Sequence, residues 1–271
     1  MRLSVRHTTV YAFSEPASHG LQRLRLTPKS TQGQHVLDWA MRYENAQEEF
    51  TYEDQNHNTV TLVSVAEAAQ QVTIECSGTV ETEDKAGIIG RHSGHLPLWS
   101  FMGQTPLTRP GPKLRALLRE IGGDRHDRLE WLHLLSASVR DSVAYRIGET
   151  GVRTTAEQAM EQASGVCQDH AHIFIAAARM AEIPARYVSG YLMMDDRVDQ
   201  DATHAWAEAH VDGLGWVGFD ISNGISPDRR YIRVATGRDY RDAAPVTGIR
   251  LGGRQAGMQV EVAVAQQSSA Q

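Results

Sequence analysis

Residues 164–180 are Ser164-Gly165-Val166-Cys167-Gln168-Asp169-His170-Ala171-His172, followed by Ile173-Phe174-Ile175-Ala176-Ala177-Ala178-Arg179-Met180. Apolar side chains recur here at helical spacing, which predicts a helix that is buried on most sides. Ser164 is the expected N-cap, so the helix should begin beside Cys167. Unpaired backbone N–H groups and the positive end of the helix dipole favour a thiolate at that point. Cys167 is therefore a candidate nucleophile.

A β-hairpin is predicted further along the chain. Residues 203–211 (Thr203-His204-Ala205-Trp206-Ala207-Glu208-Ala209-His210-Val211) alternate between large polar or aromatic and small apolar side chains, the period of a strand. Asp212-Gly213-Leu214-Gly215 supplies the turn, and residues 216–220 return. Folding about a centre near Asp212 places Asp220 opposite His204 on the same face, to within about one residue. An aspartate bound to one ring nitrogen leaves the other nitrogen available as a base toward a thiol.

These motifs resemble a known family. Gly165 to His172, then Ile183-Pro184-Ala185-Arg186-Tyr187-Val188-Ser189-Gly190-Tyr191-Leu192, then His204-Ala205-Trp206 and Phe219-Asp220, resemble the core of the bacterial transglutaminase-like superfamily. More narrowly, they are similar to its transglutaminase-like cysteine peptidases, in which a β-rich N-terminal domain precedes the core. The resemblance implies a papain-like core with a Cys–His–Asp triad, which by motif position is Cys167, His204 and Asp220. One departure is Ile221-Ser222-Asn223, where Pro-Thr-Asn is expected.

The composition is that of an ordinary globular protein. The chain has 271 residues, long enough for two domains or one large one, and 41% of them are hydrophobic. A formal net charge of −6 leaves no basic footprint for nucleic acid. The two cysteines, Cys76 and Cys167, lie in different motif contexts, so a disulfide framework is not expected. The N-terminus has no apolar signal core and no window reaches membrane-spanning length, so a cytoplasmic location without membrane attachment is expected.

Three regions are predicted, and together they make an α+β fold. Residues 1–83 contain runs rich in Val, Thr, Ile and Tyr and should form an antiparallel β domain, in which Cys76 is a buried packing residue. Residues 84–112 are rich in Gly and Pro and are interpreted as a connector. Residues 113–271 are interpreted as the transglutaminase-like core, with helices packed on an antiparallel sheet. Within it, Thr154-Thr155-Ala156-Glu157 is interpreted as a capping box, and strands are expected at 231–235 and 258–264.

Other interpretations compete with the triad. Taken alone, Cys167 is more simply a packing residue, and a free cysteine is commonly buried. Zinc could use Cys167 and the histidines at 170, 172, 204 and 210, but His170 and His172 point apart on a helix and no paired-ligand motif is present. The acidic run from Asp195 to Asp201 lacks the spaced ligands of a calcium loop. No metal or cofactor is therefore expected.

The predicted chemistry is acyl transfer through a Cys167 thioester. With water as acceptor the enzyme is a peptidase or amidase, and with a lysine-like amine it is a protein-glutamine transglutaminase. Hydrolysis of a peptide or protein is preferred because water is always present. A catalytically silent binding scaffold is the alternative from another class, and loss of a triad residue would be its signature. The backbone N–H of Cys167 is one expected oxyanion donor. The sequence does not indicate the second donor, the substrate or the oligomeric state.

Overall fold

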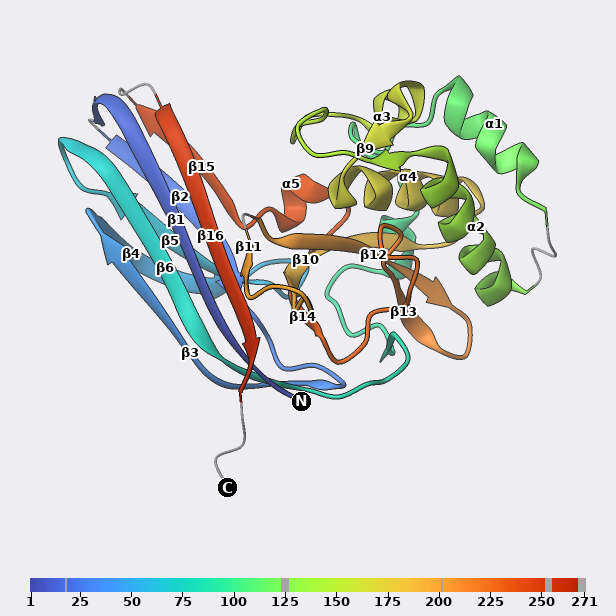
Figure 1. Ribbon diagram of the computed structural model, residues 1–271, viewed down its shortest axis with the longest axis horizontal. Helices are drawn as coiled ribbons and strands as arrows, with labels where there is room; N and C mark the ends of the chain where they lie inside the picture. Colours follow the sequence, from blue (N-terminus) through green and yellow to red (C-terminus); the bar gives the residue numbers. More distant parts are fainter. Residues whose placement is uncertain (18, 123–126, 201, 252–254, 268–271) are drawn as a thin grey trace.

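The computed structural model describes residues 1–17, 19–122, 127–200, 202–251 and 255–267. It has an α+β fold, as predicted: antiparallel sheets make most of the structure, and the helices gather at one end (Figure 1). Two sheets on the left of Figure 1 form what we call the N-terminal layer, and a third sheet, which we call the core sheet, carries the helices on the right.

The N-terminal layer is a sandwich of two antiparallel sheets. Apolar side chains from both sheets, including Phe13, Leu24, Val63 and Ile74, form the core between them. Cys76 is completely buried in this core, which confirms its predicted packing role. The first sheet has the order β11 (Asp199–Gln200), β16 (Gln255–Gln266), β1 (Arg2–Ala17), β6 (Ala69–Thr82) and β3 (Gln34–Glu44). The second has the order β15 (Val246–Leu251), β2 (His19–Thr27), β5 (Thr59–Val65) and β4 (Ala46–Glu53).

The core sheet is covered on both faces. Helix α4 packs on one face, where Ala205, Ala207 and Ala209 belong to the same apolar cluster as Phe174. The first sheet of the N-terminal layer packs on the other face, where Leu3, Val5 and Val264 contact the core-sheet residues Tyr191 and Ile232 in one apolar cluster. Every residue of β10 is consequently buried. The sheet has the order β14 (Tyr231–Gly237), β10 (Ala185–Leu192), β12 (His204–Val211), β13 (Gly215–Phe219) and β7 (Ile88–Gly90).

The helices and short elements complete the description. Helix α4 (Cys167–Met180) lies in the centre, between the other helices and β12. Leu129, Leu132, Leu135 and Val139 recur at helical spacing and predict a helix at 125–143, which is observed as α2. Residues 125–126 of that range lie outside the described part of the chain. The remaining elements are η1 (Leu98–Phe101), α1 (Pro112–Glu120), α2 (Arg128–Ser142), α3 (Ala156–Gln162), α5 (Tyr240–Ala243) and the two-residue parallel pair β8 (Ala144–Tyr145) and β9 (Ser164–Gly165).

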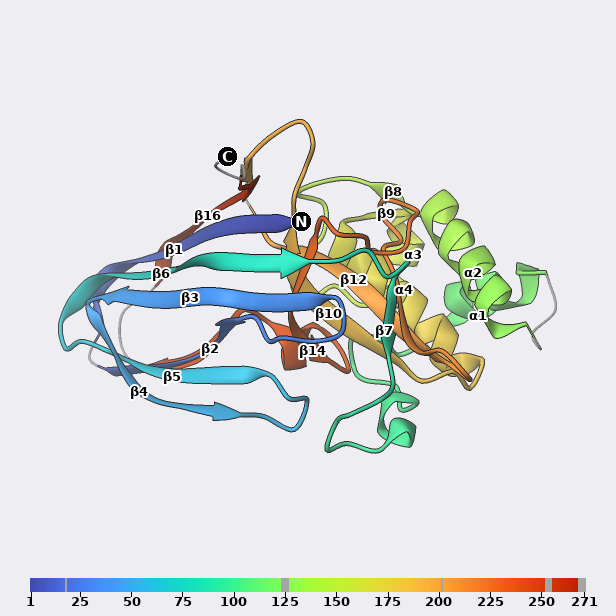
Figure 2. The same cartoon turned by 90° about the horizontal axis from the view of Figure 1, so that it is seen from below.

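The last strands of the chain lie in the N-terminal layer. Strand β16 pairs with β1 from Leu3↔Gln266 to Phe13↔Gln255, and β15 pairs with β2. Both strands fall within residues 113–271, the range expected for the catalytic core. The predicted connector also contributes a strand, because β7 pairs with β13 at the edge of the core sheet (Figure 2). Period-two alternation indicates that a segment is a strand, but it does not identify the partner.

Two side-chain amides join the N-terminal layer to the core sheet. Strand β14 lies at an edge of the core sheet, where its backbone N–H and C=O groups need partners. The amide of Gln34 accepts from the N–H of Arg233 and donates to its C=O, each at 2.8 Å. Asn58 does the same for Thr236, at 2.8 and 2.7 Å. Both amides are buried, so the edge backbone groups of Arg233 and Thr236 are hydrogen-bonded by side chains in place of another strand.

The capping box of α3 lies one residue later than predicted. Thr155 is the N-cap, and its hydroxyl accepts from Gln158 N–H at 3.3 Å while the Gln158 side chain accepts from Thr155 N–H at 2.9 Å. Glu157, the expected partner, instead caps α1, where it accepts from the backbone N–H groups of Gly111, Lys113 and Leu114. A long carboxylate side chain can satisfy the free N–H groups of a neighbouring helix as well as its own.

Substitution of Val264 by aspartate tests whether β16 is integral to the fold. Val264 is fully buried between the N-terminal layer and the core sheet, so an unpaired carboxylate there should lower the free energy of unfolding by about 3–5 kcal/mol. Met258 lies on the same strand and is 57% exposed, so Met258→Asp should cost no more than about 0.5 kcal/mol. Urea denaturation measures both values, and equal losses would show that β16 is dispensable.

Candidate active site

Helix α4 begins at Cys167, as the sequence analysis predicted, but the cap is different. Ser164 does not cap the helix, because it belongs to β9, which pairs with β8. The carboxylate of Asp169 takes the capping role: it accepts from Val166 N–H at 2.9 Å and from the Thr150 hydroxyl at 2.6 Å. Cys167 is the first helical residue and is partly exposed. N–H groups in the first turn of a helix have no intrahelical acceptor, so they remain available to an anion.

The hairpin brings Asp220 to His204. Their side chains are joined by a hydrogen bond of 2.6 Å between His204 Nε2 and Asp220 Oδ2. The register Ala207↔Phe219 is two residues away from the predicted one, so that continuing it places Asp220 opposite Trp206. A shift by two keeps the side chain on the same face, and the contact with His204 is diagonal. The predicted pair therefore forms despite the different register.

Cys167 completes the group, because its side chain lies close enough to His204 to raise the pKa of the imidazole. His204 is 9% exposed and Asp220 is fully buried. An ionised carboxylate only accepts, so Nε2 of His204 carries a proton toward Asp220 and Nδ1 is the nitrogen left for the thiol. The structure thus brings together all three residues that the sequence nominated.

Asp220 is held by more groups than the sequence analysis identified. It accepts from the Tyr231 hydroxyl at 2.7 Å, from the Asn223 side chain at 2.7 Å and from the Asn223 backbone N–H at 3.2 Å. The Asn223 bonds are those of a turn that an aspartate begins, a signal present in the sequence. Tyr231 could not have been found, because it reaches Asp220 from β14, two strands away from β12. Asp220 is fixed from three directions.

Opposing effects determine the charge of the pair. Burial alone would lower the pKa of His204, but hydrogen bonds to Asp220 and Cys167, together with their negative charge, raise it to about 10. Burial alone would raise the pKa of Asp220, but the hydrogen bond and charge of His204, with the bonds from Tyr231 and Asn223, lower it. At neutral pH the geometry therefore favours a His204 imidazolium beside an ionised Asp220.

Trp206 both shields the pair and fills the core. Its ring is 2% exposed and stacks on His204, with ring centroids 6.1 Å apart. Tyr231 packs edge-on against Trp206 at 5.4 Å. Val188 and Leu192 close the same cluster. Trp206 therefore has both roles, because the apolar side chains that fill this part of the core also exclude water from the His204–Asp220 bond.

The other histidines near Cys167 bond to protein groups. His170 contacts Ser222 Oγ at 2.8 Å through Nδ1 and the Val143 carbonyl at 2.9 Å through Nε2. Ser222 belongs to the segment that departs from the family pattern. Nε2 of His172 accepts from the Tyr240 N–H at 3.1 Å. These nitrogens are engaged in positioning α4 against its neighbours.

Within the described residues, one group has the geometry of potential metal ligands, and it lies elsewhere. It consists of Glu53, His57 and His95, whose ligand atoms lie within 4.8 Å of one another. The three are joined as an ion-pair cluster, since Glu53 lies 2.6 Å from His57 and the two imidazole rings stack at 4.1 Å. In the acidic run, Asp195 pairs with Arg230, and Asp201 lies outside the described residues.

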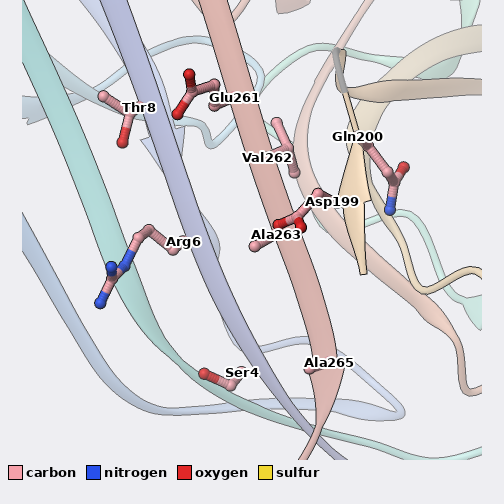
Figure 3. Close-up of a pocket in the computed structure, with 9 residues that line it drawn as sticks. All are labelled: Ser4, Arg6, Thr8, Asp199, Gln200, Glu261, Val262, Ala263 and Ala265. Carbon is pink, nitrogen blue, oxygen red and sulfur yellow. The ribbon is translucent and has the colours of Figure 1, made fainter. Parts of the chain in front are cut away.

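A cavity of about 520 Å³ lies on the outer face of the N-terminal layer, and Cys167, His204 and Asp220 are not among the residues that line it. Figure 3 shows side chains from β1, β16 and β11 spread along the strands, without a point on which they converge. Its charged members are Arg6, Asp199 and Glu261, and it contains neither cysteine nor histidine. This cavity offers no nucleophile.

Comparison with known proteins agrees with the geometry. The family model of the transglutaminase-like superfamily matches residues 115–221, and that of the bacterial transglutaminase-like N-terminal region matches residues 3–81. An uncharacterized protein of Mycobacterium leprae is 30% identical over 264 residues, which cover 93% of this chain and 94% of that protein. The chain belongs to the transglutaminase-like superfamily. An uncharacterized protein of Mycobacterium tuberculosis is also similar to this transglutaminase-like chain, with 29% identity over 92% of this chain and 87% of that protein.

A solved structure supports the transglutaminase-like fold. A protein of Cytophaga hutchinsonii, provisionally described as a cysteine protease, superposes with a TM-score of 0.77 at 21% identity, over 100% of this chain and 92% of that one. The family and fold predicted from the motifs around Cys167 are thereby confirmed. Among the described residues, no helix combines the length and the apolar character that crossing a membrane requires.

Proposed function

We propose that this chain is a cysteine peptidase or amidase that cleaves amide bonds of a peptide or protein through a thioester on Cys167. The observation that carries the proposal is the 2.6 Å bond between His204 and a fully buried Asp220, with Cys167 beside the same imidazole at the start of α4. A nucleophile, a base and a group that orients the base are the parts that covalent acyl transfer requires.

The reaction proceeds in two halves. The Cys167 thiolate attacks the amide carbonyl, a C–S bond forms, and the carbonyl oxygen becomes an oxyanion. His204 then gives its Nδ1 proton to the amine, the C–N bond breaks, and the amine leaves. In the second half water gives a proton to His204 and attacks the thioester, so that the C–S bond breaks and a carboxylic acid is released. Asp220 keeps Nε2 protonated throughout.

The oxyanion has one donor in the backbone N–H of Cys167, at the positive end of α4. Tyr145 lies close enough for the charges of Cys167 and Asp220 to act on its hydroxyl, and burial followed by these two charges raises its pKa to about 12. Its side chain is 52% exposed, and it lies on β8, which pairs with the strand β9 that leads to the nucleophile. We propose the Tyr145 hydroxyl as the second donor.

Alkylation should distinguish an active site from an inert scaffold. Near pH 6, iodoacetamide is expected to modify Cys167 at least about a hundredfold faster than Cys76, because the latter is fully buried and burial raises its pKa to about 12. Peptide mapping by mass spectrometry gives both rates in one sample. His204→Ala should remove most of the difference. Equally slow rates at the two cysteines would favour the scaffold.

The acceptor is identified by a second experiment. A peptide pool is incubated with the protein and a labelled primary amine, with Cys167→Ala as the control. New peptide termini that depend on Cys167 support hydrolysis. Amine adducts on glutamine that depend on Cys167 would instead make the protein a transglutaminase, because the amine would then replace water as the second nucleophile.

A further inference from the structure

A second cavity, of about 450 Å³, lies between the N-terminal layer and the core sheet and collects positive side chains. Lys29 and Asn56 reach it from loops of the N-terminal layer, Arg91 follows β7, and Arg186 and Arg233 come from β10 and β14. We call these five residues and the space between them the cationic pocket. Cavities of this size hold small organic ligands.

The cationic pocket is separate from the triad. His204 and Glu208 lie on the same face of β12, opposite to Ala207 and Ala209, which pack with α4. Glu208 binds Arg186 and Arg233 on that face. Glu208 is four residues from His204, which is about 13 Å along a strand. The inference below therefore does not depend on the proposed function.

Positive charge exceeds negative charge in this pocket. Arg186 and Arg233 share one carboxylate, that of Glu208, at 2.6 Å each, and all three side chains are at least nine-tenths buried. Among the described residues, Lys29 donates to the backbone carbonyls of Asn56 and His57, at 3.1 and 2.5 Å. Lys29, Arg186 and Arg233 therefore face one buried carboxylate, that of Glu208, and the exposed Glu53 carboxylate lines the pocket as well. Burial, together with the charges of Arg233 and Arg186, lowers the pKa of Lys29 to about 7, which shows the cost of its charge there.

Hydrogen-bond donors in the pocket lack acceptors. Asn56 is 7% exposed, and neither Nδ2 nor Oδ1 of its side chain has a partner in the part of the chain that the structure describes. Among the described residues, Glu208 takes Nε of Arg186 and both Nε and Nη2 of Arg233, so Nη groups of both arginines remain for a ligand. A buried polar group without a partner costs free energy, and native proteins rarely leave one without a reason.

A purely structural ion cluster explains only part of this arrangement. Glu208 accounts for the burial of two guanidinium groups, but it does not account for the third cation, the free Nη groups or the unpartnered amide of Asn56. An anion with several oxygens supplies all three. Guanidinium groups from different strands suit such a ligand, because each forms charge-assisted bonds to a different oxygen.

We propose that the cationic pocket binds a small, doubly charged oxyanion, either an organic phosphate or a polycarboxylate. Its charged group lies between Arg186, Arg233 and Lys29 and is held by Asn56 Nδ2. Trp216, with the Arg186 guanidinium 3.8 Å from its ring centroid, forms an adjoining wall for the rest of the molecule. Arg91, an exposed residue at the rim, contributes a further charge.

Thermal denaturation and isothermal titration test the proposal with inorganic phosphate, sulfate and citrate, against sodium chloride at equal ionic strength. The wild-type melting temperature should rise with anion concentration, as it does for any ligand that binds only the folded state. Arg91→Gln should raise the Kd for the anion about tenfold or more, since it removes a charged donor. Arg109→Gln, a matched change at another exposed arginine, should leave the Kd unchanged.

Asn56→Asp is the decisive variant. It places a carboxylate of nearly the same shape among the cations, so it should abolish anion binding while the melting temperature in chloride stays equal or rises. Stronger binding of phosphate and sulfate than of citrate assigns the phosphate class, and the reverse assigns polycarboxylates. Three results would overturn the proposal: the same stabilisation by chloride, an unchanged Kd in Asn56→Asp, or equal effects of Arg91→Gln and Arg109→Gln.

Discussion

Replacing Cys167 by alanine is expected to lower kcat/KM for peptide hydrolysis by about 10⁴- to 10⁶-fold, the loss that follows removal of a covalent nucleophile. No other sulfhydryl can substitute, because Cys76 is buried in the N-terminal layer. The fold should survive, because Cys167 is partly exposed at the first position of α4 and alanine is the best helix former. Circular dichroism and a discontinuous peptide-cleavage assay give the two results.

Cys76→Ala is the matched control for this loss. Cys76 is fully buried and its Sγ lies 3.5 Å from the Tyr191 hydroxyl, so its truncation should cost about 1–2 kcal/mol of folding stability. The kcat/KM of Cys76→Ala should remain within about twofold of wild type, because Cys76 is remote from the acyl-transfer residues. Hydrolysis that persists in Cys167→Ala would contradict the assigned nucleophile.

The candidate site was predictable because its signals are local. Cys167 lies at a helix start that apolar periodicity indicates, and His204 and Asp220 belong to one hairpin with a Gly-containing turn. An error of two residues in the register did not separate the pair, since strand periodicity preserves the face. The cap of α4 was missed because its N-cap residue is Val166, whose side chain cannot accept a hydrogen bond. Only the second half of a capping box is present, in which Asp169, three residues later, accepts from the Val166 N–H.

The pairing of distant strands was not predictable in the same way. Strand β16 has a clear alternation, but its partner β1 lies at the other end of the chain, and any edge with a matching pattern would satisfy the same signal. Strand β4 has a weak sequence signal, because most of its residues are exposed and three of its eight residues are glutamates. The hydrogen bonds from Gln34 and Asn58 to β14 were not predictable either, because the sequence does not show which backbone groups a side-chain amide binds.

This connection matters for the triad. Tyr231, which donates to Asp220, is on β14, and β14 has β10 on one side and the amides of Gln34 and Asn58 on the other. The N-terminal layer therefore braces the strand that holds the orienting carboxylate. A structural role for the N-terminal layer in positioning Asp220 follows from these bonds, whether or not the layer also binds a partner.

Asp220→Asn is expected to lower kcat/KM by about 10²- to 10⁴-fold with little change in shape. The neutral amide can present its NH₂ to Nε2 of His204, which places the ring proton on Nδ1 and leaves no base toward Cys167. Without the negative charge, burial dominates and the pKa of His204 should fall well below its wild-type value of about 10. NMR titration of the histidine signals measures this change directly.

The same substitution changes how stability depends on pH. A histidine whose pKa is raised in the folded state stabilises the fold fully below about pH 6.5, and this contribution is lost as the pH rises toward about 10. The lowered pKa of Asp220 adds stability above about pH 4 that is lost as the pH falls. The advantage of wild type over Asp220→Asn should therefore be largest near pH 5–6.5 and should shrink in both directions. Urea denaturation at several pH values measures it.

Asp239→Asn separates this effect from a general response to neutralising a buried carboxylate. Asp239 is also buried, and its side chain accepts from the Arg241 N–H at the start of α5, a role that asparagine performs equally well. Its kcat/KM and the pKa of its His204 should match wild type, because Asp239 is not bonded to the triad. If Asp220→Asn kept its activity and the high pKa of His204, the orienting role would have to belong to Tyr231 or Asn223, since these are the groups that would still hold residue 220 against the imidazole.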